Sequence, residues 1–250
     1  MQAMPRLAIV TGGATGIGKA IAQALAADGD QVVILGRRAG ALETAAAEIN
    51  KAVDADRVGW HQVDLTRPEQ VEAAVTALAD GDRTVDVLIN NAGGITSGSG
   101  DSLSDVADAW RRDFDANVLT TVLLTEALLP HLRRPGGRVI AVSSVAALRG
   151  AGSYGAAKAA LHAWMYGLSA ELAADGITVN VVAPGFIPDT RFWEGRLTQD
   201  MYDARVGAIP MGRAGTPDEV AAAVRYLAGP DSGYTTGQIL QVNGGWVTGR

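Results

Sequence analysis

The sequence predicts an α/β fold with one doubly wound parallel sheet of about seven strands and helices on both faces. Seven short runs rich in β-branched residues recur along the 250 residues, and Ala-rich stretches with helical periodicity lie between them. The apolar runs are nearly continuous, which is typical of strands buried on both faces of a parallel sheet. Strand–helix alternation over the whole length, without a repeat or a linker, indicates right-handed crossovers in a single domain spanning residues 1–250.

The expected elements follow one another in order along the chain. We expect strands at residues 7–10, 31–35, 58–63, 85–89, 138–142, 177–182 and 238–242. We expect helices at residues 16–28, 39–51, 68–79, 103–132, 152–174 and 217–228. Asp218 and Glu219 lie in the first turn of the last helix, where acidic side chains complement the helix dipole.

Residues 186–209 form the one long segment without clear periodicity, and this segment contains Phe192, Trp193, Met201 and Tyr202. A long loop at the carboxyl end of a parallel sheet is usually functional, and apolar residues there can cover a substrate. We therefore predict a substrate-binding loop at 186–209. The alternative is a structural loop whose aromatic residues fill a subunit interface.

The composition and net charge of the chain indicate which classes of binding partner to expect. With 48% hydrophobic residues and 31 glycines, the chain suits a compact fold with many tight turns. A net charge of −6 offers nucleic acid no basic surface, so the expected partner is a small molecule. The chain has no cysteine and its three histidines are scattered, so we expect no metal site and surface positions for His61, His131 and His162. No apolar run approaches the ~20 residues of a membrane span, and residues 1–6 lack the regions of a signal peptide, so we expect a cytoplasmic protein without membrane contact.

Tyr154 and Lys158 stand four residues apart in an Ala-rich run, so both side chains are expected on one face of a helix. A phenol is a poor acid–base group at neutral pH, but a cation beside it stabilises the phenolate and lowers its pKa. Tyr154 could then exchange protons with an alcohol or carbonyl, and Ser144, which follows the apolar run 138–142, could hydrogen-bond the same oxygen. The spacing alone is equally compatible with a tyrosine and a lysine on an exposed helix surface.

The first expected strand leads into the segment 11–18 (TGGATGIG), and a helix follows it. Gly12, Gly16 and Gly18 would let the backbone turn sharply, approach a pyrophosphate and pack the helix against the strand. The N-terminus of the helix would offer free N–H groups to the phosphates. Three residues separate the first two glycines, so the dinucleotide-binding fingerprint applies by mechanism rather than by spacing. A glycine-rich turn without a ligand is the alternative.

The second expected strand is followed by Gly36, Arg37 and Arg38. A cofactor that carries only ribose hydroxyls at this position favours an acidic residue, whereas a 2′-phosphate needs cations. The sequence therefore predicts NADP(H) as the preferred cofactor and NAD(H) as the less favoured one. Solvated positions at the start of a helix are the alternative for one or both arginines.

Taken with these motifs, the chain resembles the short-chain dehydrogenase/reductase family, whose members have a Rossmann-type fold, and the resemblance covers essentially its full length. Beyond the glycine turn, the serine and the Tyr-x-x-x-Lys pair, it is carried by Asp64 and Leu65, 90–93 (NNAG), Asn117, 180–185 (NVVAPG), 212–217 (GRAGTP) and 236–245 (TGQILQVNGG). Within the family, the chain looks most like the 3-oxoacyl-thioester (acyl carrier protein) reductase type.

The resemblance implies a role for each matching residue. It makes Tyr154 the acid–base residue and Ser144 the group that polarises the substrate carbonyl. Lys158 would lower the pKa of the tyrosine and bind the nicotinamide ribose. Asn117 would hold a water that links Lys158 to solvent, although an asparagine bonded only to its own helix backbone is the alternative. The implied cofactor-binding residues are Gly12, Ala14, Thr15, Gly16, Ile17, Gly18, Arg37, Arg38, Asp64, Leu65, Asn91, Ala92, Gly93, Tyr154, Lys158, Pro184, Gly185, Ile187 and Thr190.

Two departures from the family pattern leave assignments open. Ser144 precedes Tyr154 by ten residues, fewer than in many relatives, so Ser143 is the alternative catalytic serine. Pro188 and Asp189 separate Thr190 from the Pro-Gly pair that it usually follows closely, so its contact with the nicotinamide carboxamide is open.

The sequence thus predicts an NADP(H)-dependent oxidoreductase that transfers a hydride between nicotinamide and a carbonyl or secondary alcohol carbon, with a 3-oxoacyl thioester as one candidate substrate. The alternative is a dinucleotide-binding protein that senses redox state without turnover. The resemblance also implies a homotetramer, built on the helices around Asn117 and Tyr154 and on residues 239–246. Apolar residues that we expect on an outer helix face are Leu161, Trp164 and Leu168.

Overall fold

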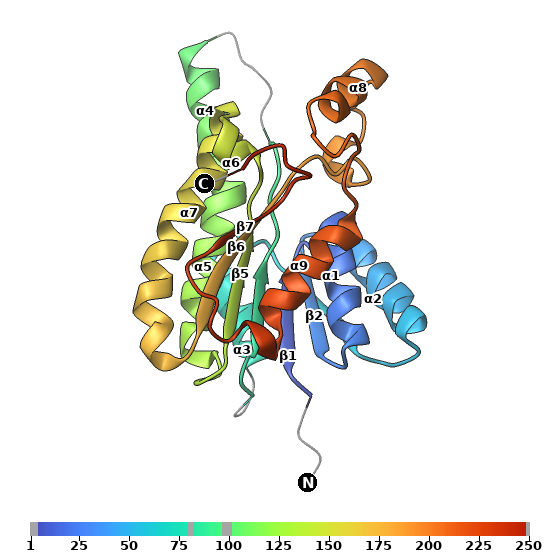
Figure 1. Ribbon diagram of the computed structural model, residues 1–250. Coiled ribbons are helices and arrows are strands. Elements are labelled where there is room, and N and C mark those ends of the chain that lie inside the picture. The colour runs from blue at the N-terminus through green and yellow to red at the C-terminus, as the bar shows by residue number, and fades with distance from the viewer. Residues whose placement is uncertain (1–4, 80–82, 97–101, 249–250) are drawn as a thin grey trace.

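In the computed structural model, which describes residues 5–79, 83–96 and 102–248, helices cover both faces of one parallel sheet (Figure 1). The strand order is β3-β2-β1-β4-β5-β6-β7, so the order reverses between β1 and β4. Open α/β sheets bind ligands in the crevice at such a reversal, outside the carboxyl ends of the strands. The predicted doubly wound fold is therefore confirmed. The expectation that residues 1–6 lack the regions of a signal peptide rests largely on residues 1–4, which lie outside the described residues.

The strands overlap their predicted positions. They are β1 (Leu7–Thr11), β2 (Gln31–Gly36), β3 (Val58–Gln62), β4 (Val87–Asn90), β5 (Arg138–Val142), β6 (Thr178–Pro184) and β7 (Ile239–Val242). The longer helices are α1 (Gly16–Ala27), α2 (Ala39–Val53), α3 (Pro68–Leu78), α4 (Leu103–Phe114), α5 (Thr120–Leu128), α7 (Gly152–Leu172), α8 (Gln199–Gly207) and α9 (Pro217–Ala228). Shorter helical turns are η1 (Asp115–Leu119), η2 (Leu129–His131), α6 (Ala146–Arg149), η3 (Ala173–Asp175), η4 (Arg191–Trp193) and η5 (Pro230–Ser232).

Each face of the sheet has its own apolar core. Helices α1, α2 and α9 cover one face, where Leu25 and Val224 pack with strand residues such as Val10. Helices α3, α5 and α7 cover the other face, where Leu124 and Met165 pack against β4 and β5. The central strands β1, β4, β5 and β6 are buried on both faces, so their sequences are largely apolar rather than alternating, whereas the edge strand β3 is mostly exposed.

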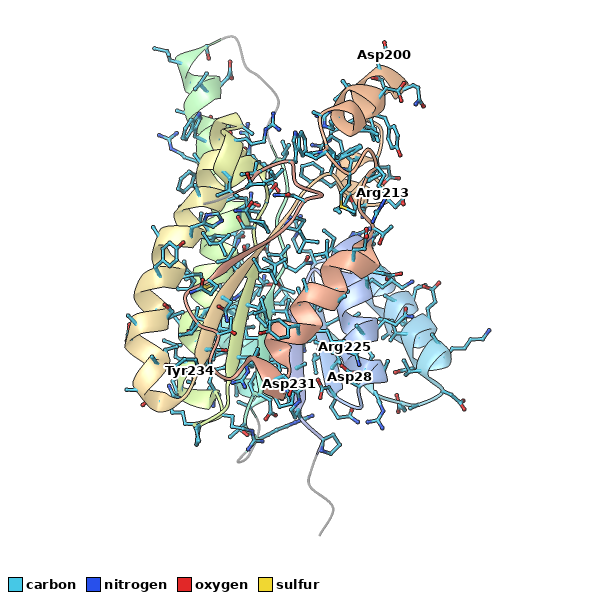
Figure 2. All side chains as sticks on the ribbon, viewed as in Figure 1. Asp28, Asp200, Arg213, Arg225, Asp231 and Tyr234 are labelled. Atoms are coloured by element: carbon cyan, nitrogen blue, oxygen red, sulfur yellow. The ribbon has the colours of Figure 1, made fainter. Side chains whose placement is uncertain are left out.

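The last helix is fastened to the first. Helix α9 packs along α1, and Arg225 of α9 forms an ion pair with Asp28 at the end of α1 (Figure 2). At the other end of α9, Thr216 and Glu219 form a capping box, which fixes the start of the helix where the sequence predicts it. The last long helix is therefore held against the helix that follows the glycine turn.

Two predicted elements differ in detail from the structure. Residues 103–132, expected as one helix, form α4, η1, α5 and η2 in succession. The middle segment η1 is a π-helical turn, which inserts a bulge into an otherwise regular helix, and such bulges are frequent at functional sites. No glycine or proline marks this bulge in the sequence, so periodicity alone reads the segment as continuous.

Residues 186–209, expected to lack regular structure, contain η4 and α8. The Thr198 hydroxyl accepts the N–H of Met201 and caps the start of α8. None of the residues of α8 is buried, so the helix shows no apolar stripe in the sequence. Helix α8 stands away from the sheet, with Asp200 at its outer end (Figures 1 and 2).

The expected outer apolar face of α7 was wrong. Leu161 and Leu168 are buried, and Trp164 packs against the core of the α7 face. The large apolar side chains exposed on α4 and α7 include Trp110 and Tyr166. The homotetramer itself stays a prediction. Among the described helices, none is long and apolar enough to cross a bilayer.

Candidate functional site

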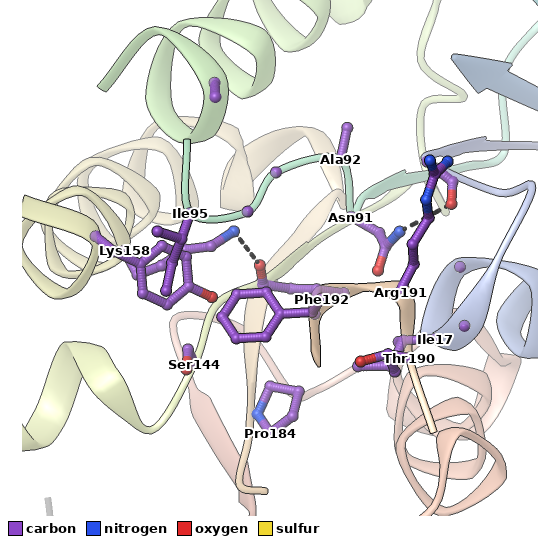
Figure 3. A pocket seen from close by; sticks show the side chains of 18 of the residues that line it. Ile17, Asn91, Ala92, Ile95, Ser144, Lys158, Pro184, Thr190, Arg191 and Phe192 are labelled. Carbon is purple, nitrogen blue, oxygen red and sulfur yellow. Dashed lines mark hydrogen bonds between the residues drawn. The ribbon is translucent and has the colours of Figure 1, made fainter. Parts of the chain in front are cut away.

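A cavity of about 1140 Å³ opens at the carboxyl ends of the central strands (Figure 3). The segments that follow β1, β2, β3, β4, β5 and β6 all contribute to its walls. Of the residues that the sequence singles out for catalysis or cofactor binding, every one except Asn117 lines this cavity. The fold therefore brings together side chains that are far apart in the chain.

The glycine turn after β1 has a backbone that only glycine accommodates. Gly12 and Gly16 have φ values of +65° and +52°, in the left-handed region. A Cβ atom at Gly18 would lie 2.3 Å from the carbonyl oxygen of Gly12, so glycine allows α1 to begin directly against the turn. Thr15, the N-cap residue, makes no side-chain hydrogen bond to the first turn of α1, which leaves N–H groups of that turn for an anion. Ala14 and Ile17 complete this wall of the cavity.

The ends of β2 and β3 form the next wall. Arg37 and Arg38 line the cavity, and the amide of Gln62 donates to the carbonyl oxygen of Arg37 at 2.9 Å. Burial raises the pKa of the Asp64 carboxyl, but hydrogen bonds from Thr66 and the charge of Arg37 bring the net pKa below its usual value. Asp64 therefore stays ionised near the guanidinium groups of Arg37 and Arg67. Leu65 lies next to it in the wall.

Side-chain hydrogen bonds join the carboxyl ends of β1 and β4. The Thr11 hydroxyl accepts the N–H groups of Asn91 and Ala92 at 2.9 and 2.8 Å. The Asn91 amide donates to the carbonyl oxygen of Thr11 at 2.9 Å. These bonds hold the two strand ends at the point where the strand order reverses.

Asn117 lies behind the cavity wall, in the π-helical turn η1. Its side-chain amide donates to the carbonyl oxygens of Gly94 and Asp113, both at 2.8 Å, and its Oδ1 accepts the N–H of Gly94 at 2.9 Å. A Cβ atom at Gly93 would lie 2.5 Å from this Oδ1 and 3.0 Å from the Nζ atom of Lys158. Glycine at position 93 thus lets the asparagine and the lysine approach the same segment, and the asparagine is not bonded only to its own helix.

Tyr154 and Lys158 lie one turn apart on α7, and Ser144 approaches from the end of β5 (Figure 3). The Lys158 ammonium donates to the carbonyl oxygen of Val142 at 3.0 Å. Burial lowers the pKa of Lys158 to about 8. Burial also raises the pKa of the Tyr154 phenol to about 12; a hydrogen bond with Ser144 opposes this rise and the charge of Asp113 adds to it. The expected lowering of the tyrosine pKa is therefore not found, because burial outweighs the hydrogen bond with Ser144.

The two adjacent serines have different surroundings. The Ser143 hydroxyl is buried, donates to the carbonyl oxygen of Lys158 at 3.2 Å and contacts Nε2 of His162 at 2.7 Å. The Ser144 hydroxyl is half-buried at the cavity wall and accepts the N–H of Ala146 at 3.1 Å. The geometry favours Ser144 as the serine that meets a substrate. The surface position expected for His162 was wrong, because it faces β5 one turn beyond Lys158.

The segment after β6 runs back toward the glycine turn. Its lining residues include Pro184, Gly185 and Ile187. The Thr190 hydroxyl donates to the carbonyl oxygen of Ile187 at 3.1 Å, and the Thr190 methyl carbon lies 3.1 Å from where a Cβ atom at Gly16 would be. Figure 3 shows Thr190 well apart from Lys158. Thr190 therefore lies at the glycine-turn end of the cavity.

The segment 186–209 covers the cavity with aromatic side chains. The ring of Phe192 lies 5.5 Å from that of Tyr154, centroid to centroid. Phe186 makes edge contacts with Trp193 and Tyr202, at 5.3 and 5.5 Å. The sequence interpretation did not identify three further lining residues, Arg149, Arg196 and Trp246, because no motif marks them and only the fold of this segment and of the chain end brings them to the cavity. No group of histidine and acidic residues in the described ranges could hold a metal ion.

The chain is similar to known proteins over most of its length. A model of the family described as "Enoyl-(Acyl carrier protein) reductase" matches residues 12–247. The nodulation protein G of Rhizobium sp. (strain N33) is 39% identical over 244 residues, which cover 96% of both chains. A 3-oxoacyl-[acyl-carrier-protein] reductase of Vibrio cholerae is 37% identical over 250 residues, again 96% of both chains.

Two solved structures are also similar. The Pseudomonas aeruginosa RhlG/NADP active-site complex superimposes with a TM-score of 0.87 at 34% identity, over 96% of each chain. A single-substitution variant of actinorhodin polyketide ketoreductase with NADPH superimposes with a TM-score of 0.86 at 29% identity, over 97% of each chain.

Proposed function

Because this chain belongs to the short-chain dehydrogenase/reductase family and is an oxidoreductase, we propose that it transfers a hydride between NADPH and a carbonyl or secondary alcohol carbon. One observation carries the proposal: Tyr154, Ser144 and Lys158 lie at one end of the cavity whose other end is the glycine turn. A dinucleotide whose phosphates rest on the turn would extend along the cavity toward the tyrosine.

The residues at the glycine turn and the end of β2 fit such a cofactor. The turn offers a close backbone approach and free N–H groups, both of which suit a pyrophosphate. Arg37 and Arg38 follow Gly36, and no carboxylate occupies the strand end, which favours a ribose 2′-phosphate over two ribose hydroxyls. The two solved relatives contain NADP and NADPH, which supports the same choice.

When bound, the nicotinamide cofactor supplies the hydride, while the chain supplies position and a proton. In the reducing direction, the Tyr154 hydroxyl donates a proton to the developing alkoxide. Its raised pKa keeps the hydroxyl protonated at neutral pH, which suits a proton donor. The Ser144 hydroxyl hydrogen-bonds the same substrate oxygen, and the Lys158 ammonium stabilises the phenolate that forms.

The tyrosine must then be reprotonated, and Asn117 is proposed to hold a water for this step. The side-chain amide of Asn117 is already hydrogen-bonded to Gly94 and Asp113. The water would therefore bind main-chain carbonyl groups of the π-helical turn instead. A π-helical turn leaves carbonyl groups with fewer helical partners, which suits this role. The water would connect Lys158 with solvent without opening the cavity.

The substrate is proposed to be a small molecule, with 3-oxoacyl thioesters as candidates because the Vibrio cholerae relative is a 3-oxoacyl-[acyl-carrier-protein] reductase. The cytoplasmic location and the homotetramer stay predictions. Light scattering of the purified chain tests the assembly, and a monomer at micromolar concentration would contradict it.

A turnover assay tests the proposed function. Purified chain is mixed with NADPH and a panel of carbonyl compounds that includes S-acetoacetyl-N-acetylcysteamine, and the nicotinamide absorbance is followed. We expect substrate-dependent loss of NADPH with at least one compound and none without substrate. Tight NADPH binding without turnover of any compound would favour the redox-sensing alternative instead.

A further inference from the structure

The substrate end of the cavity is rich in guanidinium groups. Three of the arginines that line the cavity, Arg149, Arg196 and Arg205, belong to this end, while a fourth, Arg191, lies beside Asn91 and Thr190 toward the glycine turn (Figure 3). Asp64 is the only carboxylate among the described lining residues, and it lies at the opposite end, beside Arg37. Because the chain as a whole has a net charge of −6, the positive charge at the substrate end is a local feature with the opposite sign.

Two of these arginines are engaged within the segment 186–209. Arg191 forms an ion pair with Glu194 at 3.3 Å. The Arg205 guanidinium lies 4.6 Å from the ring centroid of Trp193 and donates to the carbonyl oxygen of Met201 at 3.2 Å. Both interactions hold the covering segment together, so these two side chains are not the ones to bind a ligand.

Arg149 and Arg196, like Arg205, form no ion pair with a carboxylate within the described residues. They differ from Arg205 because their ring contacts are not joined by a hydrogen bond of ordinary length to a carbonyl oxygen. The Arg149 guanidinium lies 4.4 Å from the ring centroid of Trp246. The Arg196 guanidinium lies 5.9 Å from the ring centroid of Phe192 and makes one long hydrogen bond, 3.4 Å, to the carbonyl oxygen of Ile95. An aromatic face orients a guanidinium and leaves its N–H edge free for an anion.

Phe192 connects this charge to the proposed chemistry. Its ring lies against the ring of Tyr154, with centroids 5.5 Å apart. The same ring also contacts the guanidinium group of Arg196. A substrate whose carbonyl oxygen lies at Tyr154 therefore extends past Phe192 toward a guanidinium group.

We propose that the substrate is an organic anion, whose carboxylate or phosphate group is bound by Arg196 and Arg149 while its carbonyl oxygen lies at Tyr154 and Ser144. The inference rests on the proposed function and names the class of its substrate. A charge-assisted hydrogen bond strengthens binding enough that one well-placed arginine gives a preference of about tenfold to hundredfold for the anion over a neutral isostere.

The first test compares 4-acetylbenzoate with 4-acetylbenzamide, two rigid ketones of the same shape that differ in charge. A second pair, acetoacetyl-CoA and S-acetoacetyl-N-acetylcysteamine, carries the same oxoacyl thioester with and without nucleotide phosphates. We expect the anionic member of at least one pair to have a kcat/KM about tenfold to hundredfold higher with NADPH. A preference within the first pair indicates that the arginines bind a carboxylate, and a preference within the second pair indicates that they bind a phosphate group.

Variants identify the groups responsible. Arg196→Gln and Arg149→Gln should each reduce the preference, by lowering kcat/KM for the anionic member more than for the neutral one. Lys51→Gln, which removes an exposed charge at the end of α2, is the control and should keep the full preference. Equal kcat/KM within both pairs, or a preference that survives both arginine substitutions, would overturn the inference while turnover of the neutral compounds leaves the proposed function standing. Absence of turnover with all four compounds counts against both.

Discussion

The two ends of the cavity are built in different ways. At the glycine turn, the backbone itself makes the site, since a single added carbon at Gly18 would meet a carbonyl oxygen at 2.3 Å. At the covering segment, side chains pack on one another, and an added carbon at Gly207 would meet nothing within 4 Å. The turn therefore permits few substitutions, whereas the cover can change its residues without changing the fold.

The same contrast appears in how the two ends are anchored. Helix α1, which starts at the turn, buries Ile21, Leu25 and three smaller residues against the sheet and α9. Helix α8 buries none of its residues, and its Tyr202 and Arg205 side chains contact the aromatic rings of Phe186 and Trp193. We therefore expect substitutions at the turn to affect folding and cofactor binding, and substitutions in the cover to affect substrate use.

The largest expected effect separates proton transfer from cofactor binding. Tyr154→Phe removes the proton donor but keeps the ring that packs on Phe192. We expect kcat to fall by about 10²- to 10⁴-fold, while the Kd of NADPH, measured by its fluorescence, stays nearly the same. Lys158→Ala should damage both quantities. Substantial turnover by Tyr154→Phe at saturating NADPH would show that another group carries the proton.

The second prediction concerns how the free energy of unfolding depends on pH through the buried side chain of Lys158. The pKa of Lys158 falls from 10.5 to about 8 on folding, so between these values the unfolded chain holds a proton that the folded chain has lost. The free energy of unfolding without cofactor should therefore rise with pH across this window, on the order of 1–3 kcal/mol in total. Tyr154, whose pKa is raised from 10.0 to about 12, acts in the opposite sense above that window.

Urea unfolding at both ends of the window measures this rise. In Lys158→Met the rise should be absent, because the titrating group is gone, while Lys51→Gln should keep it. An identical pH dependence in wild type and Lys158→Met would show that the lysine is not desolvated in the folded chain.

The third prediction compares a glycine at each end. Gly18→Ala should lower the free energy of unfolding by about 1–3 kcal/mol and weaken NADPH binding, because the methyl group forces α1 away from the turn. Gly207→Ala, in open space in α8, should be neutral or stabilising by up to about 1 kcal/mol. Urea denaturation of both variants checks this. Similar losses in both would mean that the two ends are equally constrained.

The fourth prediction concerns cofactor choice at the turn end. Arg37→Ala should erase most of the preference for NADPH over NADH, which we expect to be about tenfold to hundredfold in kcat/KM. Thr15 lies where many relatives that prefer NADPH carry a second basic residue, so the preference depends on Arg37 and Arg38. Equal kcat/KM values of wild type for the two cofactors, on one carbonyl substrate, would contradict the assignment.

The difference between the two ends also decides what the sequence could predict. Glycines at fixed places after an apolar strand have one physical reason, a backbone that no side chain permits, so Gly12, Gly16 and Gly18 were identifiable without the structure. The pairing of Tyr154 with Lys158 follows likewise from helical spacing. Helix α8 could not be predicted from periodicity because it has no buried face, although Thr198 and the capping geometry offered a local signal.

Arg149 and Arg196 could not be predicted at all, since each reaches the cavity only after distant segments pack together. The π-helical turn at Asn117 was missed for a related reason: it adds one residue to a helix whose composition does not change. The raised pKa of Tyr154 likewise depends on burial by Phe192 and its neighbours, which spacing along one helix does not reveal.

The smallest expected effect comes from two matched helix caps. Thr198 caps α8 in the cover and Thr216 caps α9 in the core, each by accepting an N–H group of the first turn. Thr216→Ala should lower the free energy of unfolding by about 1 kcal/mol, because α9 is fastened to α1 and unfolds with the whole domain. Thr198→Ala removes a similar bond, but α8 buries no residue, so its loosening should leave global unfolding unchanged and raise KM for the carbonyl substrate. Urea denaturation and steady-state kinetics of the two variants make the comparison. An equal loss of global stability in Thr198→Ala would mean that the cover folds as part of the core, and that the two ends of the cavity differ less than their packing indicates.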